Sequence, residues 1–166
     1  MPIAQTLLPE FDIEMANTRN ALALVPEQHA AWKPHAKSYS LGDLAAHIAT
    51  LPHWASMTIR ESSFDLAAPQ DGSGREFTTT ARLLERFDEV VGKARPALQA
   101  ASDEQLMGPW TLKHGAHEIF TMPRLAVLRS FVMNHLIHHR GQLTVYLRLK
   151  DVPLPQIYGP TADAKT

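Results

Sequence analysis

The chain has 166 residues, a formal net charge of −1 and no cysteine. This length predicts a single domain over residues 1–166 that can fold without a disulfide or a metal. The absence of cysteine excludes thiolate zinc sites, a cysteine nucleophile and structural disulfides. The balanced charge argues against a nucleic-acid partner.

Two features of the sequence bear on the location of the protein. The N-terminus lacks the basic start and long apolar run of a signal peptide. No window of about 18 apolar residues is present, so we expect no membrane partner and no membrane span. The expected location is the cytoplasm.

Apolar residues at helical spacing dominate the first third of the chain. They predict a first helix over residues 6–25, which Pro26 ends. A second helix is expected to begin at Ser40, because Ser40 and Asp43 have the spacing of a capping box. Pro52 removes a backbone donor and crowds the preceding turn, so it should kink this helix.

The remainder of the chain contains two further predicted helices. Residues 71–74 form the clearest linker, and a third helix follows over residues 79–95, where Pro96 bends or ends it. Residues 101–122 are irregular, with a short hairpin around Gly115 as one alternative. The fourth helix runs from about residue 123 to residue 149, and residues 150–166 form a non-helical tail.

These elements predict an all-α protein. The expected architecture is a four-helix bundle of the up-down-down-up type, with a long irregular segment between helices three and four.

The fourth helix carries an unusual pair of histidines. Residues at alternating steps of four and three predict its core-facing seam: Leu128, Val132, His135, His139, Gln142, Tyr146 and Leu149. An unpaired polar ring in a core costs about 1–3 kcal/mol, so something should compensate for the two imidazoles. His47 has the same kind of position in the second helix, and neutral imidazole is a common metal ligand. The spacing therefore favours a metal site built from His47, His135 and His139.

Other interpretations of the histidines stay open. A histidine on an apolar face is often a core residue hydrogen-bonded to a neighbour. His138 is expected at or near the surface, and Gln142 either binds a metal-bound water or marks a polar edge of the core. His114 and His117 have a spacing that only weakly suggests a structural metal. The zincin signature needs Glu directly after its first histidine. Leu136 occupies that position here, which disfavours a metalloprotease of that kind.

The segment from residue 121 to residue 150 is free of Asp and Glu but contains five basic residues: Arg124, Arg129, Arg140, Arg148 and Lys150. We expect solvated side chains or partners of acids on other helices. The sharper alternative is that some of them, Arg140 or Arg148 in particular, attract an anionic substrate toward the histidines.

Four stretches carry a resemblance to a known family. They are Trp-Lys-Pro at residues 32–34, residues 41–48 around His47, residues 134–143 around His135 and His139, and the tail at residues 155–163. Together they resemble the DinB-like family of metal-binding four-helix proteins. The resemblance implies that His47, His135 and His139 hold one divalent ion, expected to be zinc or nickel, with water in the remaining positions. It also implies a homodimer.

The resemblance leaves two classes of function. The first is a metal-dependent enzyme, such as a low-molecular-weight thiol S-transferase or a related hydrolase, acting on a small-molecule substrate. Because the chain has no cysteine, the thiol would come from a small molecule. The second is a non-catalytic metal- or ligand-binding module of the stress response. A nucleic-acid-linked damage factor is a weaker third class, which the balanced charge disfavours.

Overall fold

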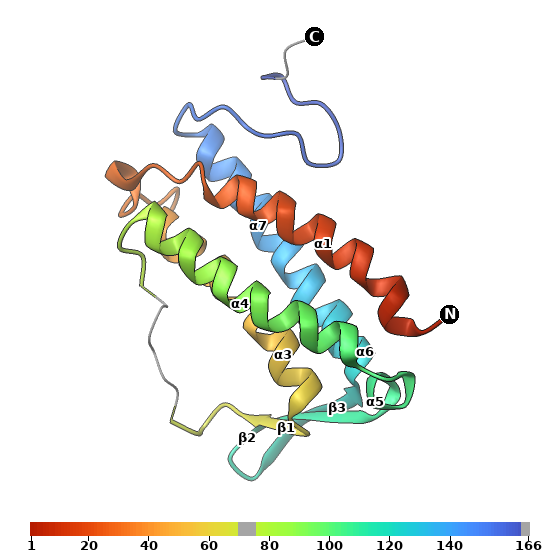
Figure 1. Ribbon diagram of the computed structural model, residues 1–166. Coiled ribbons are helices and arrows are strands. Elements are labelled where there is room, and N and C mark those ends of the chain that lie inside the picture. Colours follow the sequence, from red (N-terminus) through yellow and green to blue (C-terminus); the bar gives the residue numbers. More distant parts are fainter. Residues whose placement is uncertain (70–75, 164–166) are drawn as a thin grey trace.

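The computed structural model describes residues 1–69 and 76–163, and the predicted linker at residues 71–74 lies outside them (Figure 1). The elements of the first half are α1 (Ile3–Leu22), the short 3-10 helix η1 (Glu27–His29), α2 (Leu41–Thr50), α3 (His53–Arg60) and β1 (Ser63–Asp65). The second half contains α4 (Thr80–Ala100), α5 (Asp103–Met107), β2 (Pro109–His114), β3 (His117–Pro123), α6 (Arg124–Val127), the π-helical segment η2 (Leu128–Asn134) and α7 (His135–Arg148).

The start and the break of the second predicted helix are confirmed. The Ser40 hydroxyl accepts a hydrogen bond from the backbone N–H of Asp43 at 3.1 Å, which caps α2. The chain leaves helical order at Leu51 and Pro52 and resumes it in α3. The proline therefore divides one predicted helix into two shorter ones.

Pro96 does not end the third predicted helix, because α4 continues through it to Ala100. Pro96 is exposed, so the backbone carbonyl that loses its donor can be hydrated. Ala94 and Leu98 are buried on either side of it and hold the same face of α4 against the core. Packing on that face thus keeps the helix intact beyond the residue at which we expected a bend or an end.

The long helices enclose the main core. α1 packs against α4 and α7, α4 also contacts α2 and α3, and α2 contacts α7. The largest apolar side chains buried in this core are Phe11, Leu22, Leu41, Leu44, Ile48, Phe87, Leu106, Leu136, Leu143 and Leu147. Within residues 1–69 and 76–163, no helix combines the length and the apolar character needed to cross a lipid bilayer.

The expectation of a purely α-helical four-helix bundle needs correction, because the described part of the chain also contains a three-stranded sheet. β2 and β3 form an antiparallel hairpin that turns at Gly115, whose φ of +60° suits glycine. β1 pairs with β2 in parallel. The hairpin alternative for this segment is confirmed, and the sheet lies at one end of the long helices (Figure 1). The up-down-down-up order stays a prediction.

The sheet has a small core of its own. Trp110, Leu112 and Val127 are buried there, and Trp54 and Phe120 pack against them. Alternate residues of β2 point into this core, whereas the rest of the strand is more exposed. A stretch of only six residues gives a weak period-2 signal, which is why the sequence favoured an irregular segment.

The fourth predicted helix is continuous in space but changes its winding. Between α6 and α7 the seven residues of η2 are π-helical. A π-helical bond joins residues five apart, so such a segment inserts an extra residue into the helical repeat. The buried residues of α7 are Leu136, Arg140, Leu143 and Leu147. The predicted seam through His135, His139, Gln142, Tyr146 and Leu149 is therefore wrong by one position, because the sequence pattern assumed α-helical winding throughout.

Residues 151–163 are non-helical, as predicted for the tail. Two contacts hold them against α7. The Asp163 carboxylate forms an ion pair with Arg148 and accepts the Leu154 N–H at 2.9 Å. The Tyr158 hydroxyl reaches the buried Arg140 at 2.7 Å.

Candidate metal centre

Three histidine rings meet at the contact between α2 and α7. His47 comes from the second turn of α2, and His135 and His139 come from the first two turns of α7. The Nε2 atom of His135 lies 3.5 Å from Nε2 of His47 and 2.9 Å from Nε2 of His139. One nitrogen from each ring lies within 4.8 Å of the other two. Among the residues that the structure describes, no other group of three or more histidine or acidic side chains is this compact.

These separations fit one metal ion. A zinc–nitrogen bond is about 2.0–2.1 Å long, so two imidazole nitrogens at octahedral or tetrahedral angles around one ion are about 2.9–3.4 Å apart. The observed separation of 2.9 Å lies at the lower end of this interval, and that of 3.5 Å lies just above its upper end. The predicted set of His47, His135 and His139 is therefore brought together with a spacing suited to a shared cation.

Hydrogen bonds at the far side of two rings fix their orientation. The Nδ1 atom of His139 lies 2.7 Å from the side-chain oxygen of Gln142, and Nδ1 of His135 lies 3.3 Å from the backbone carbonyl of Phe131. Both acceptors require a proton on Nδ1, which leaves a lone pair on each Nε2. The two Nε2 atoms lie 2.9 Å apart and each carries a lone pair, so they cannot hydrogen-bond to each other, but both can bind one cation. Gln142 thus holds a ligand ring, a role that the sequence did not indicate.

The local environment keeps His139 neutral. Burial lowers the pKa of its imidazole, and the neighbouring His135 and His138 lower the pKa further, while the hydrogen bond to Gln142 acts in the opposite direction. The neutral imidazole is the form that coordinates a metal. At neutral pH the ring is therefore ready to act as a ligand.

The triad lies at the edge of the core rather than in its centre. All three rings are half-buried. Because η2 shifts the helical repeat, Leu136 and Arg140 face the core and the two histidines of α7 turn toward α2. Structural zinc sites are usually closed by four protein ligands, whereas a site with three leaves room for another molecule. This arrangement is that of an open site.

Aromatic side chains border the triad on two sides. The Tyr39 ring is stacked on His47, with 5.9 Å between centroids and 20° between planes. Phe131, one turn before His135, is stacked on Phe120 of β3 with 4.7 Å between centroids. The sequence did not single out these three residues, since they lie in separate segments with no common spacing.

The five basic residues of the acid-free segment all have partners. The Arg124 guanidinium donates to the backbone carbonyls of residues 58, 61 and 109. Arg129, Arg140 and Arg148 pair with Glu10, Glu14 and Asp163. The Lys150 ammonium lies 4.2 Å from the centroid of the Trp32 ring. The prediction of acidic partners on other helices is confirmed for Arg129 and Arg140, whose partners lie on α1, whereas the partner of Arg148 lies in the non-helical tail. The steering of an anion by Arg140 finds no support because Arg140 is 2% exposed.

The remaining histidines stay outside the triad. His138 is exposed, with its ring centroid 5.0 Å from that of His139, as expected for a surface residue. His114 and His117 are exposed and pair across the end of the β2–β3 hairpin. Among the described residues, no third ligand completes a compact metal group with them.

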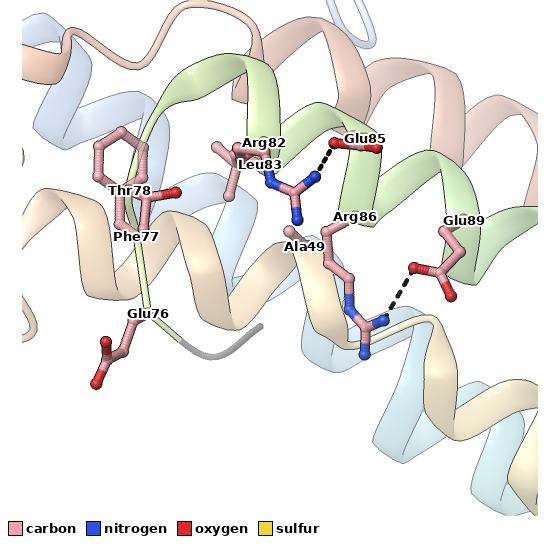
Figure 2. A pocket seen from close by; sticks show the side chains of 9 residues that line it. All are labelled: Ala49, Glu76, Phe77, Thr78, Arg82, Leu83, Glu85, Arg86 and Glu89. Carbon is pink, nitrogen blue, oxygen red and sulfur yellow. Dashed lines mark hydrogen bonds and ion pairs between the residues drawn. The ribbon is translucent and has the colours of Figure 1, made fainter. Parts of the chain in front are cut away.

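A separate cavity of about 380 Å³ lies beside the first turns of α4. Figure 2 shows that two arginines in it point toward glutamates of the same helix, Arg82 toward Glu85 and Arg86 toward Glu89. These ion pairs neutralise the arginines, and no histidine of the triad lines the cavity. None of the three candidate metal ligands therefore contributes to this cavity.

Comparisons with known proteins identify the family of the chain. The chain matches the DinB family over residues 1–165. It is 30% identical over 133 residues to the uncharacterized protein YjoA of Bacillus subtilis (strain 168), covering 80% of this chain and 81% of that protein. It is 25% identical over 161 residues to the uncharacterized protein YrdA of the same organism, covering 94% of this chain and 88% of that protein.

Solved structures share the fold. The crystal structure of YjoA, a DinB-like protein, has a TM-score of 0.70 at 23% identity and covers 92% of this chain and 96% of its own. A DinB-like protein from Bacillus cereus ATCC 10987 has a TM-score of 0.71 at 21% identity, with 95% and 98% covered. At these identities the likeness concerns the fold alone.

Proposed function

The chain belongs to the DinB family, and we propose that it is a metal-dependent enzyme that joins a low-molecular-weight thiol to an electrophile. His47, His135 and His139 would hold one divalent ion, with zinc or nickel as the expected metal. A related hydrolase, in which water replaces the thiol, would use the same ligands. A homodimer and a cytoplasmic location stay predictions.

One observation carries this proposal. The Nε2 atoms of three half-buried rings converge, and the Nδ1 atoms of His135 and His139 are occupied by acceptors. The lone pairs on these nitrogens therefore point to one common position. The three histidines supply ligands to this position from the side of α2 and α7. Such a position suits an ion that also binds a small molecule.

A bound ion would lower the pKa of a thiol or a water molecule, so that a nucleophile exists at neutral pH. The protein's own residues keep the ligand rings neutral and oriented. In the net reaction the thiol sulfur bonds to the electrophilic atom, the leaving group departs with its bonding electrons, and the thiol proton passes to solvent. Because the chain has no cysteine, the sulfur belongs to the cosubstrate.

The first test is metal content. Protein purified without a metal-binding tag should contain close to one divalent ion per chain by elemental analysis. The His135→Ala variant should lose most of this metal, whereas His138→Ala, which changes an exposed neighbour on the same helix, should retain it. Full metal retention in His135→Ala would contradict the proposal.

The second test separates an enzyme from a binding module. The cobalt-substituted protein should change its visible spectrum when a thiol is added, because sulfur replaces a water ligand. Cobalt binding without a response to any of several thiols would favour the non-catalytic metal-binding module instead.

A further inference from the structure

We infer that the molecule entering the open positions of the metal centre carries a flat, uncharged aromatic group, which rests against Phe131 and Tyr39. This inference rests on the proposed function and specifies the substrate class of the same site. Phe131 lies in η2, directly before α7, and Tyr39 lies two residues before the start of α2. The backbone carbonyl of Phe131 contacts His135, and the Tyr39 ring is stacked on His47.

Phe131 marks the sheet side of the site. Its backbone carbonyl lies 3.3 Å from Nδ1 of His135, and the residue precedes His135 by one helical turn. The Phe131 side chain is 39% exposed although it is large and apolar. Its ring is inclined by only 27° to that of Phe120, with 4.7 Å between centroids. The Phe131 side chain, stacked on Phe120, therefore adds an apolar surface one helical turn along the chain from the ligand His135.

The surface is firmly supported from behind. The Phe120 ring lies 6.2 Å from the ring of Trp110, which is fully buried, and Trp110 lies 6.3 Å from Trp54. Side chains backed by a packed aromatic cluster keep their orientation. A preformed apolar surface beside polar ligand atoms is typical of small-molecule sites.

Tyr39 borders the other side of the triad. Its ring is stacked on His47, and the residue is 52% exposed. An aromatic ring gains free energy from stacking beyond the area it buries, so the exposed rings of Tyr39 and Phe131 favour a flat ligand group.

The basic residues of the segment that contains α7 are already engaged and offer an anion no free partner. The five basic residues of the segment that contains both histidines of α7 are paired with acids, carbonyls or the Trp32 ring. The exposed Asp43, one turn before His47 on α2, would repel an anion. An apolar group, by contrast, gains from covering Phe131.

The test compares two uncharged thiols on the cobalt-substituted full-length protein. Titrations followed by the visible spectrum give dissociation constants for phenylmethanethiol and 2-mercaptoethanol. Burial of an aromatic ring is worth about 1.5–3 kcal/mol, so we expect the aromatic thiol to bind about 10-fold to 100-fold more tightly.

Variants show whether the preference comes from the assigned residues. Phe131→Ala should reduce the preference to less than about a third of its original value while cobalt still binds. Phe131→Leu keeps an apolar side chain without the flat ring, and it should give an intermediate preference if the alanine variant folds poorly. Ile13→Ala removes an exposed apolar side chain from α1 and serves as the matched control, which should keep the full preference.

The possible outcomes separate this inference from the function on which it rests. Equal affinities for the two uncharged thiols, or an undiminished preference in both Phe131 variants, would overturn the inference and leave the thiol-binding metal centre intact. A spectrum that no thiol changes would overturn the proposed function itself.

Discussion

Arg140 and Glu14 form a buried ion pair between α7 and α1, with 2.7 Å between Nη2 and Oε2 and side chains 2% and 6% exposed. The other guanidinium nitrogen donates to the Glu14 carbonyl and to the Thr18 hydroxyl at 3.1 Å and 3.2 Å. The Tyr158 hydroxyl donates to the Glu14 carboxylate at 2.8 Å. Arg140 directly follows His139, so this network fixes α7 at a position about 100° around the helix from that candidate ligand.

Removal of one partner of this pair should be strongly destabilising. Arg140→Met leaves the Glu14 carboxylate buried without its counterion, and we expect the free energy of unfolding to fall by about 3–5 kcal/mol. Urea denaturation measures this change. The double variant Arg140→Met with Glu14→Leu should recover most of the loss, because no unpaired charge remains. A single variant that loses less than about 1 kcal/mol would show that the pair is solvated.

Tyr158 should attach the tail to the same network. Burial raises the pKa of its phenol, and the hydrogen bond to Glu14 raises it further, so the hydroxyl remains a donor at neutral pH. Tyr158→Phe removes this donor and should lower the free energy of unfolding by about 1 kcal/mol. Tyr146→Phe is the matched control, since the edge contact of Tyr146 with the Trp32 ring survives the change. Equal stability of the two variants would argue against the attachment.

Gln142 should tune metal affinity without contributing to the core. It is exposed, and its side-chain oxygen lies 2.7 Å from Nδ1 of His139. Loss of such a partner typically weakens metal binding 10-fold to 100-fold, which is the decrease we expect for zinc binding by Gln142→Leu in a competition titration. Gln142→Glu, which retains an acceptor, should bind at least as well as the natural protein. Unchanged affinity in the leucine variant would exclude this role.

Removal of the metal should lower the melting temperature without unfolding the protein. The core of apolar residues is continuous without the triad, and the three rings lie at its edge. A ligand that binds only the folded state adds stability in proportion to the logarithm of its concentration over its dissociation constant. Zinc should therefore raise the melting temperature, chelator should reverse the rise, and His139→Ala should not respond. Loss of the helical circular dichroism signal after a chelator removes the metal would contradict the prediction that the protein stays folded.

The contact between Asp163 and Arg148 should depend on pH. The hydrogen bond from Arg148 lowers the pKa of the Asp163 carboxyl, and the Leu154 N–H lowers it further. A folded-state pKa below the unfolded one stabilises the protein above the unfolded value of about 3.9, and this contribution disappears as the pH falls through the folded value.

Asp163→Asn tests this dependence, because it keeps the shape of the side chain and removes its charge. At pH 6–7 the variant should melt at a lower temperature than the natural protein, and the two melting curves should converge in acid, where the natural carboxyl is neutral as well. A difference that stays constant down to pH 2.5 would show that the charge of Asp163 has no part in holding the tail.

Local sequence signals predicted much of the helical framework. Ser40 marks the start of α2 because its hydroxyl caps the Asp43 N–H, and Pro52 interrupts the following helix because it has no donor. These effects act over a few residues. Pro96 has the same local chemistry but lies in a helix that packing sustains, so its sequence position alone was misleading.

The three histidines that the structure brings together were predicted from the sequence. The physical reason for that prediction was only partly correct. The spacing of His135 and His139 places both rings on one face of any helix, and that much is local. We expected the two histidines on the buried face of the helix. Because η2 inserts one extra residue, Leu136 and Arg140 lie on the buried face instead. The histidines are ligand candidates because they lie beside the core and face His47, not because they replace core residues.

The sequence by itself determined the main helical segments, the cap at Ser40 and the placing of two histidines one turn apart, because hydrogen bonds and side-chain positions within one helix depend on neighbours a few residues away. For His47 there was an expectation from the sequence, which the tertiary structure realises by placing its Nε2 atom 3.5 Å from that of His135. Only the tertiary structure decided that Glu14 neutralises a buried Arg140 and that Phe120 supports Phe131. Each of these contacts joins residues of different elements, and the packing of those elements sets their distance.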